Sequence, residues 1–295
     1  MTFSVVIPTK NRPKELNKFI NSLINQSKMP DQIIIIDQSK KDLCEKEKIS
    51  KLLFNRNLNL TYIHDESING LVEAKNHSLE YNNCEIISFF DDDIILMEDY
   101  FEKIEIAFSN NKKILGANGY IINHPKQRFL KYLFFSLTHI GLFKDNRNSL
   151  YREKINQPTK LNVISGGISS WKCQIFEKVK FDLQNHFHEF EDIEFSVRFR
   201  KYFPNSIYLI PDAKLYHFHS INRINEHLRI KNIAFEAIKF FKKNKNYNLF
   251  GLDLLLLCFN IFIKSVKLSY KRKNVFLISY FFEGIREGIS YKIHP

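Results

Sequence analysis

The chain has 295 residues, of which 44% are hydrophobic, and its 28 Phe and 13 Tyr are enough to bury a large core, which excludes a disordered protein. The formal net charge of +12 is concentrated in residues 221–295, which hold 14 Lys and Arg against 5 Asp and Glu. No CxxC pair is present, so neither a zinc ribbon nor a disulfide framework is expected, and the cysteines predict buried, inert thiols: Cys44, Cys84, Cys173 and Cys258.

The first hundred residues alternate short apolar runs with amphipathic stretches. The runs at 4–8, 32–37, 60–65 and 85–90 predict strands, each followed by a polar turn. Two helices are predicted between them, one over residues 69–81 and one from apolar residues at helical spacing: Leu16, Phe19, Ile20, Leu23 and Ile24. The chain begins with a strand pattern and shows neither a basic leader nor an apolar h-region, so we expect a cytoplasmic protein.

The later pattern is less regular. Residues 129–143 fit either a helix or part of an acceptor-side insertion within the irregular stretch 116–158. Residues 161–179 predict a strand, a glycine turn, a second strand and a helix. A further helix is expected over 188–203, and extended structure over 207–220 closes the domain.

Strands that alternate with helices predict an α/β fold with a Rossmann-like, mostly parallel central sheet flanked by helices. In such folds, ligands bind beyond the carboxyl ends of the strands. Polar residues fall at those ends, namely Thr9, Asn11, Asp37 and the acids 91–93. We therefore expect one cleft to collect them.

Three consecutive acids follow the apolar run IISFF. Side chains alternate along an extended segment, so we expect Asp91 and Asp93 to share a face, or to splay around a turn, and Asp92 to point elsewhere. Two close carboxylates suit Mg²⁺ or Mn²⁺, and such an ion can bridge the phosphates of a nucleotide. The alternative is a solvated acidic turn that caps the helix beginning near Glu98.

A second acidic group lies in the stretch FHEFEDIEFSVRF. On a helix Glu191 and Glu194 are neighbours, whereas Asp192 faces about 100° away from Glu191. One of these carboxylates can act as a general base toward an acceptor hydroxyl. A helix with a solvated acidic face explains the spacing equally well.

Two further features can contribute to a site. His217 and His219 are two residues apart on an expected strand and therefore share a face, so one neutral imidazole can complete a metal site. A structural His pair is the alternative. Gly166 and Gly167 follow Ser165 and allow close approach to a ligand, although they also suit an ordinary tight turn.

Taken in order, seven stretches resemble the family-2 glycosyltransferases of bacterial surface-polysaccharide assembly, of the capsule and O-antigen type. They are VVIPTKNRPKELNKFINSLINQ, IIIIDQS, GLVEAKNHSLE, IISFFDDDIIL, SGGISSWKCQIFEKV, FEDIEFSVR and HFHS, and the resemblance covers about residues 3–223. The resemblance implies a GT-A fold and a metal-dependent, inverting transfer from a nucleoside-diphosphate sugar, with a UDP-sugar favoured, to a hydroxyl of a glycan or lipid-linked acceptor.

The resemblance also implies roles in donor binding. The first nucleotide-contacting loop corresponds to Pro8, Thr9, Asn11 and Arg12, and Asp37 corresponds to the acid that hydrogen-bonds the base. Lys75 stands where the family often has Arg and would approach the diphosphate. Gly166 and Gly167 are placed with the nucleotide sugar. The stretch IDQS replaces the more frequent DDGS, which leaves the base less defined.

The metal and the base follow from the same resemblance. Asp91–Asp93 match the DxD motif, with Asp93 as the first choice of ligand, Asp91 beside it and Asp92 near the ribose. His217 matches the late metal-ligand histidine, with His219 as its substitute. Within the ED pair, Asp192 is the expected base and Glu191 supports it. No QxxRW motif of processive synthases is present, so addition of a single sugar is expected.

The chain divides into a GT-A catalytic domain, residues 1–223, and a basic, amphipathic helical C-terminal region, residues 224–295. Its longest apolar run, Leu254–Ile263, is interrupted by Asn260 and is about half of the roughly 20 residues that a spanning helix needs. The region is therefore expected either to lie on the anionic inner leaflet or to pack on the protein itself, including as a homodimer contact.

A different class of function has to be weighed against the enzyme. A non-catalytic nucleotide-sugar-binding or scaffold protein on the same fold is the main alternative, and donor turnover separates the two. No nucleic-acid partner is expected, because the basic residues are interleaved with apolar ones and no recognition motif is found. A nucleotidyltransferase is disfavoured because no GxGxR-like loop follows the first strand.

Overall fold

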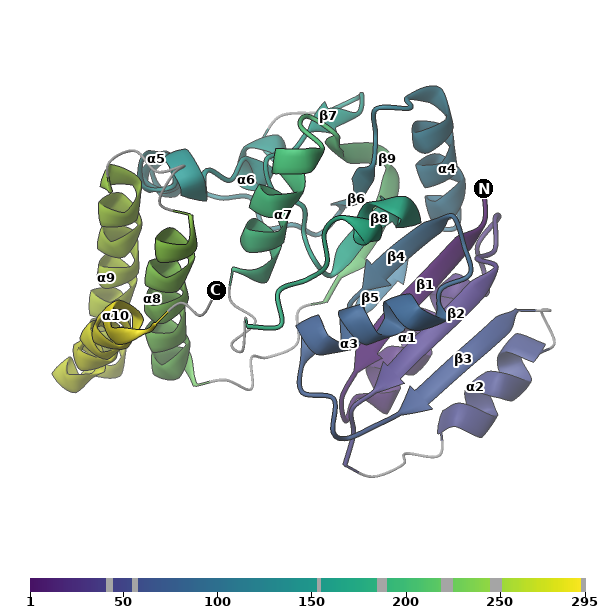
Figure 1. Cartoon of the computed structure of the whole chain (residues 1–295), viewed down its shortest axis with the longest axis horizontal. Coiled ribbons are helices and arrows are strands. Elements are labelled where there is room, and N and C mark those ends of the chain that lie inside the picture. The colour runs from purple at the N-terminus through teal and green to yellow at the C-terminus, as the bar shows by residue number, and fades with distance from the viewer. Residues whose placement is uncertain are drawn as a thin grey trace.

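In the computed structural model, the described residues are 1–40, 45–54, 58–152, 155–184, 190–218, 225–244 and 251–292. They form one sheet of nine strands in the order β3-β2-β1-β4-β8-β6-β9-β5, with β7 paired to β9 (Figure 1). The strands are β1 (Phe3–Thr9), β2 (Gln32–Asp37), β3 (Asn59–His64), β4 (Ile86–Phe90), β5 (Ile94–Leu96), β6 (Gly116–Ile121), β7 (Thr159–Lys160), β8 (Ile168–Lys172) and β9 (Ile207–His217).

The first four strands of the sheet are parallel, as expected for strands joined through helices. β1 pairs with β2 and β4, and β2 pairs with β3, all in parallel. The second half makes the sheet mixed, because β8 runs antiparallel to both β4 and β6. β9 is parallel to β6 and antiparallel to β5 and β7. The predicted α/β class is confirmed.

Helices cover both faces of the sheet. They are α1 (Pro13–Leu23), α2 (Glu45–Phe54), α3 (Leu71–Ser78), α4 (Tyr100–Asn110), α5 (Phe129–Thr138), α6 (Arg147–Leu150), α7 (Glu191–Tyr202), α8 (Glu226–Lys243), α9 (Leu252–Arg272) and α10 (Ser279–Ser290). Short 3₁₀ turns are η1 (Leu79–Tyr81), η2 (Gly141–Phe143), η3 (Cys173–Glu177) and η5 (Val275–Ile278). Residues 129–143, for which the sequence fits either a helix or part of an insertion, form α5 followed by η2. The helix predicted at the end of residues 161–179 is the short 3₁₀ turn η3.

The alternation of side chains along each central strand divides the core into two layers. Val5 and Ile7 of β1 pack in one cluster with Leu16 and Phe19 of α1. Val6 points to the opposite face and packs with residues of α3, α7 and β8. Strands that are buried on both faces explain why β1 and β2 are continuous apolar runs.

The C-terminal helices α8–α10 are stacked at the end of the molecule where α5 and α7 lie (Figure 1). They share a third hydrophobic cluster with α7, in which Ile193 and Val197 meet Ala234 and Leu257. Close packing of α10 on α8 depends on Gly284, where an added Cβ would overlap the carbonyl oxygen of Lys231. In the described part of the chain, no helix is both long and apolar enough to cross a bilayer.

Candidate active site

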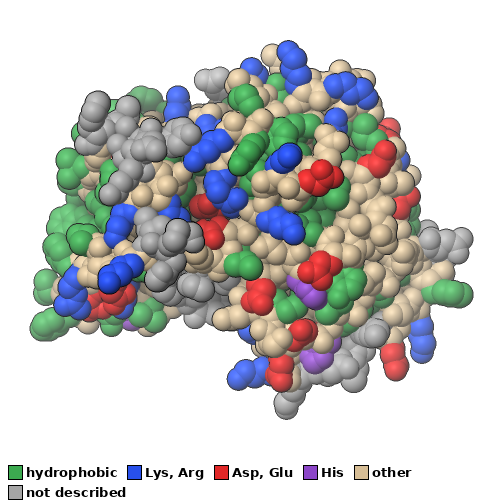
Figure 2. Space-filling view, viewed as in Figure 1, with side chains coloured by type: hydrophobic (Ala, Val, Ile, Leu, Met, Phe, Trp, Pro, Cys, Tyr) green, Lys and Arg blue, Asp and Glu red, His purple; other side chains and the backbone are tan. Residues whose placement is uncertain are grey.

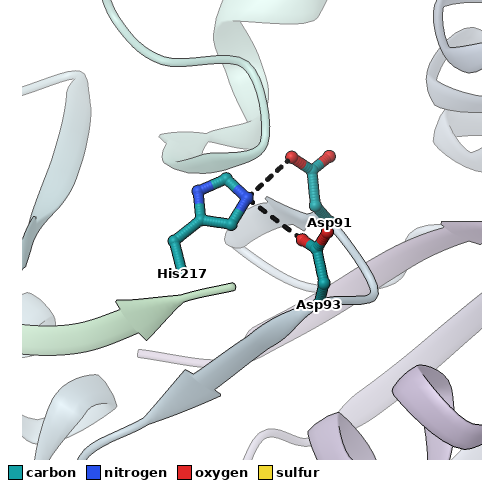
Figure 3. A group of neighbouring side chains, drawn as sticks. All are labelled: Asp91, Asp93 and His217. Atoms are coloured by element: carbon teal, nitrogen blue, oxygen red, sulfur yellow. Dashed lines mark ion pairs between the residues drawn. The ribbon is translucent and has the colours of Figure 1, made fainter. Parts of the chain in front are cut away.

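The loop between β4 and β5 brings two of the three consecutive acids beside a histidine from the far end of the chain. β5 pairs antiparallel with β9, and its first residue, Ile94, lies opposite His217. The imidazole Nε2 of His217 is 3.0 Å from Asp93 Oδ1 and 3.5 Å from Asp91 Oδ2 (Figure 3). The sheet register therefore brings His217 beside Asp91 and Asp93, although His217 lies 124 residues after Asp93 in the sequence.

These three side chains have the composition of a divalent-cation site. One ligand atom from each lies within 4.8 Å of the other two. Carboxylate oxygens with an imidazole nitrogen suit Mn²⁺, and Mg²⁺ is also compatible with the two carboxylates. Burial lowers the pKa of His217, but its hydrogen bonds to Asp91 and Asp93 outweigh burial and raise the pKa to about 9. The two carboxylates thus create a strongly cation-attracting position.

Asp92 points away from this group, as the alternation of side chains predicts. It is 3% exposed, accepts a hydrogen bond of 2.7 Å from Thr9 Oγ1 and forms an ion pair with Arg12. Burial raises the pKa of Asp92 to about 7, against the lowering effects of Thr9 and Arg12. Arg12 also lies 2.9 Å from Asp93 Oδ2, so the loop after β1 is fixed to the acidic turn.

Asp37, at the end of β2, is buried and holds a second loop in place. Its Oδ1 accepts a 2.9 Å hydrogen bond from the Ser39 backbone N–H and another from the Ser39 hydroxyl, while Oδ2 accepts 2.8 Å from Tyr62. The hydroxyl of Ser39 in turn accepts a 2.7 Å bond from the backbone of Asn11. The loops after β1 and β2 are therefore linked, and Pro8 is opposite Ile36 in their shared ladder.

Lys75 lies on α3 and pairs with the first residue of α7. Its Nζ is 2.8 Å from Glu191 Oε1 and 5.1 Å from the ring centroid of Phe181, and the lysine is 1% exposed. Burial raises the pKa of Glu191 despite the opposing charge of Lys75. The other oxygen of this carboxylate, Oε2, has no hydrogen-bond partner within the described residues.

The two glycines before β8 make room for the acids. A Cβ at Gly167 would overlap the carboxylate of Asp91, and a Cβ at Gly166 would overlap Glu191 and lie 2.8 Å from Lys75 Nζ. The backbone N–H of Asp91 also donates to the carbonyl of Gly167 at 2.9 Å. These contacts show a close approach of backbone to protein carboxylates at both glycines.

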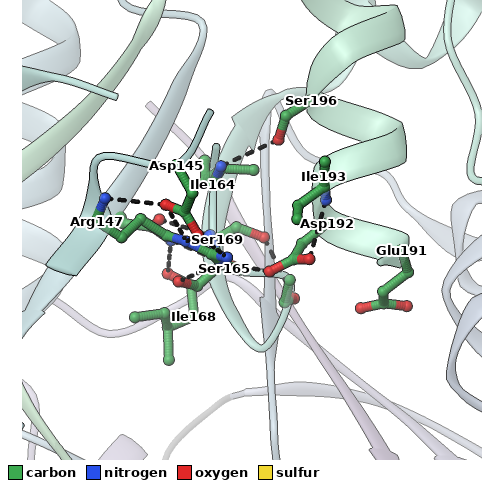
Figure 4. Close-up of polar contacts among 12 residues, drawn as sticks. Asp145, Arg147, Ile164, Ser165, Ile168, Ser169, Glu191, Asp192, Ile193 and Ser196 are labelled. Atoms are coloured by element: carbon green, nitrogen blue, oxygen red, sulfur yellow. Dashed lines mark hydrogen bonds and ion pairs between the residues drawn. The ribbon is translucent and has the colours of Figure 1, made fainter. Parts of the chain in front are cut away.

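Asp192 is held by an arginine that the sequence pattern did not single out. Arg147 of α6 forms ion pairs with Asp192 and Asp145, the latter at 2.7 Å (Figure 4). It also donates to Ser165 Oγ at 3.3 Å, while the second oxygen of Asp192 accepts 2.9 Å from the backbone of Ile193. Burial alone would raise the pKa of Asp145, but the charge and hydrogen bonds of Arg147 outweigh burial and lower the pKa of Asp145.

A cavity of about 430 Å³ lies between the Asp91 and His217 side chains and the Glu191–Asp192 pair. Its wall includes Asp91, His217, Glu191 and Asp192, and a volume of this size accommodates a sugar-sized ligand. The glycines 166 and 167 also line it, as does the irregular stretch through Asn118, Ile121, His124, Asp145, Arg147, Asn148, Leu150 and Tyr151. The predicted candidates are thus brought together from both halves of the chain.

Other candidates lie beside this cavity without lining it. Thr9, Arg12 and Asp93 connect to it through the acidic turn, and Lys75 connects through Glu191. Pro8 and Asp37 lie at the carboxyl ends of β1 and β2, and Asn11 lies in the loop after β1. His219, the substitute ligand, lies outside the described residues. Sequence reasoning missed Arg147, Asp145, Ser39 and Tyr62, because a single polar residue in a loop, in the four-residue helix α6 or in a strand carries no periodic signal.

Comparison with known proteins gives a family match and several similar folds. Residues 4–180 match the family model for glycosyl transferase family 2. An uncharacterized glycosyltransferase of Mycoplasma genitalium is 30% identical over 137 residues, which are 45% of this chain and 44% of that protein. One from Haemophilus influenzae is 26% identical over 111 residues, 38% of this chain and 36% of that protein. The chain therefore matches less than half the length of either relative.

Solved structures resemble the fold over most of the chain. The mannosyltransferase PcManGT from Pyrobaculum calidifontis, in complex with GDP-Man and Mn²⁺, has a TM-score of 0.61 at 11% identity and covers 97% of this chain and 86% of that one. TarS 1–349 from S. aureus, in complex with UDP-GlcNAc, has a TM-score of 0.58 at 17% identity, covering 98% and 79%. GalNAc-T7 with UDP, GalNAc and Mn²⁺ has a TM-score of 0.62 at 15% identity, covering 88% and 57%. These likenesses confirm a GT-A-like fold.

Proposed function

The chain belongs to glycosyltransferase family 2, and on that basis we propose that it moves a sugar from a nucleoside-diphosphate sugar to a hydroxyl group with inversion at the anomeric carbon. A UDP-sugar is the favoured donor, and the acceptor is a glycan or lipid-linked saccharide of a cell-surface polysaccharide of the capsule or O-antigen type. We propose that the reaction takes place in the cytoplasm. Addition of a single sugar is favoured over polymerisation.

One observation carries this proposal. Asp91 and His217 of the Asp91–Asp93–His217 group line the same cavity as the Glu191–Asp192 pair. An inverting transfer needs a centre that stabilises the departing diphosphate and a base on the opposite side of the sugar. Candidate residues for both requirements line a single cavity, which supports an enzyme over a scaffold protein.

In the donor half of the site, Asp93, Asp91 and His217 would hold Mn²⁺ or Mg²⁺. When bound, such an ion neutralises charge on the diphosphate oxygens as the sugar departs. Arg12 and Thr9 fix the acidic turn through Asp92 and Asp93, so the ligands are held in place before the donor arrives.

The nucleotide is proposed to lie against the linked loops that contain Pro8, Asn11 and Asp37. Lys75 is proposed to act on the diphosphate. Because Lys75 is 1% exposed and paired with Glu191, a direct contact requires that pair to open. Gly166 and Gly167 would admit the donor sugar beside the acids.

In the acceptor half, Asp192 is proposed as the base that takes the hydroxyl proton. Its ion pair with Arg147 holds the carboxylate in one orientation. Glu191 supports the pair from the side of Lys75. The walls around Arg147 and Tyr151 belong to the stretch 116–158, which we propose selects the acceptor.

Calorimetry tests the donor site directly. UDP, GDP and dTDP are titrated with and without Mn²⁺ into the wild type and Asp93→Ala, with Asp212→Ala as a matched control because Asp212 is an exposed acid on β9. We expect Mn²⁺-dependent binding of one nucleotide, lost in Asp93→Ala and retained in Asp212→Ala. Absence of binding to all three would favour the scaffold alternative.

A further inference from the structure

The exposed face of α9 carries an apolar stripe along its whole length. Leu252, Leu255, Phe259, Val266 and Tyr270 are between 36% and 88% exposed and recur at intervals of three, four or seven residues, which places them on one side of the helix. The opposite side of α9 packs on the protein through residues such as Leu257 and Ile261. The stripe is therefore an additional surface, separate from the contact that attaches α9 to the protein.

Helix α5 extends this surface. Seven of its ten residues, FLKYLFFSLT, are Phe, Leu or Tyr, yet Thr138 is its one buried residue. Phe129, Leu130, Leu133 and Leu137 are between 41% and 77% exposed. A helix of this composition is normally buried. We call the stripe on α9 together with these four side chains of α5 the apolar edge.

The two helices are in contact, so their exposed side chains form one continuous feature. The rings of Phe134 and Phe259 are 6.1 Å apart, and Asn260 donates a 2.8 Å hydrogen bond to Thr138. Figure 2 shows hydrophobic side chains along the margin of the molecule where α9 and α10 lie, with Lys and Arg side chains beside them. An exposed apolar surface of this extent indicates an interaction site.

The charges around the apolar edge identify the kind of partner. Residues 126–144 contain Lys126, Arg128, Lys131 and Lys144 and no acidic residue. Residues 254–282 contain five basic residues, Lys264, Lys267, Lys271, Arg272 and Lys273, and likewise no Asp or Glu. Pairing the edge with itself in a symmetric dimer would bring these like charges together, which is unfavourable.

We propose that the apolar edge docks on the surface of an anionic membrane. The apolar side chains of α5 and α9 enter the boundary between headgroups and acyl chains, while the lysines contact the anionic headgroups. Tyr270, which is 88% exposed, has the amphipathic ring that favours this boundary. The helices lie in the plane of the membrane, in keeping with the absence of a spanning helix from the described residues.

Docking through α5 also positions the cavity. The chain runs from α5 through η2 directly to Asp145 and Arg147 of the cavity wall. η2 is fixed to α9 by a 3.1 Å hydrogen bond from the Leu142 backbone to Asp253. The docked enzyme would thus present its acceptor side near the bilayer, as a lipid-linked acceptor requires; this consequence rests on the proposed function, whereas the docking itself does not.

Vesicle flotation of the full chain tests the docking. The vesicles are pure phosphatidylcholine or equal parts of phosphatidylcholine and phosphatidylglycerol. We expect binding to the anionic vesicles that is at least roughly tenfold stronger than to the neutral ones and that weakens with salt. Leu130→Glu with Leu255→Glu should lower partitioning by roughly a hundredfold, because two apolar anchors are lost and like charge is added.

Matched variants separate the contributions. Phe54→Glu alters a side chain that is 80% exposed on α2, outside the apolar edge, and should bind like the wild type. Lys267→Glu with Lys271→Glu should lower binding to anionic vesicles at least roughly tenfold and leave the low binding to neutral vesicles unchanged. Circular dichroism of each variant checks that the fold is retained.

Three results would overturn the docking proposal: no binding of the wild type to anionic vesicles, equal binding by the Leu130→Glu, Leu255→Glu variant, or a dimer that this variant dissociates while vesicles are never bound. Calorimetry with nucleotides reports separately on the proposed function. A wild type that binds vesicles and no nucleotide would refute the enzyme and leave the docking surface standing.

Discussion

Replacement of Arg147 by Met tests whether this residue holds the proposed base in place. The arginine is 22% exposed in its side chain and pairs with Asp145, at 6%, and with Asp192, at 23%. Removing one partner of a buried ion pair costs about 3–5 kcal/mol, because a buried charge is left without compensation. Partial exposure of Arg147 and Asp192 reduces the expected loss to about 2–3 kcal/mol of unfolding free energy.

The same change should affect turnover more than donor binding. Without Arg147, the carboxylate of Asp192 loses its fixed orientation, and a misplaced base costs roughly tenfold to a hundredfold in kcat. The KM for the donor should change little, because the Asp91–Asp93–His217 group is untouched.

A second variant makes this reasoning refutable. In the double variant Arg147→Met, Asp145→Asn, the side chain at position 145 carries no charge. Part of the unfolding free energy lost in Arg147→Met should therefore return, while turnover stays low. The assays are urea denaturation and donor turnover for the wild type, the single and the double variant. Wild-type stability and turnover in Arg147→Met, or a double variant that is still less stable than the single one, would refute the role given to Arg147.

Three further outcomes are expected. Asp192→Asn should lower turnover by roughly 10²–10⁴-fold with nucleotide affinity retained, and near-normal turnover would remove Asp192 as the base. Gly167→Ala should weaken Mn²⁺ binding in calorimetry, since its Cβ displaces Asp91, and unchanged affinity would contradict the close packing. Burial lowers the pKa of His139 to about 4, so the unfolded chain binds this proton more readily. Unfolding free energy should therefore fall by up to about 3 kcal/mol between pH 6.5 and 4, and His139→Gln should flatten that slope in urea titrations.

The parallel half of the fold could be predicted from the sequence because its signals are local. β1 and β2 are continuous apolar runs, and α1 has apolar residues at helical spacing. The antiparallel additions were not predicted, because the pairing of β8 with β4 joins residues about 80 apart and leaves no trace in a short window. The expected domain boundary after residue 223 falls outside the described residues and stays a prediction.

The acidic residues of the site could be predicted from the sequence, whereas the polar residues that pair with them could not. Alternation after β4 separates Asp92 from Asp91 and Asp93, and the contacts of Asp92 with Thr9 and Arg12 confirm that separation. Arg147 could not be found, because it lies in α6, a helix of only four residues without a periodic pattern, and reaches Asp192 through tertiary contacts. The exposure of the α5 side chains could not be predicted either. It depends on which other elements pack against the helix, and the residue pattern of α5 does not determine this.

A hydrophobic cluster joins α7 to the C-terminal helices α8–α10, so these helices cannot be removed without exposing part of the core. Ile193 directly follows Asp192 and packs in the same cluster as Ala234, Leu257 and Phe281. Lys243 of α8 also forms an ion pair of 2.6 Å with Asp182, which precedes α7 in the sequence. Exchanging the C-terminal helices for those of a relative would therefore alter the support beneath the proposed base. Chimeric enzymes need α7 and α8–α10 to be taken from the same parent.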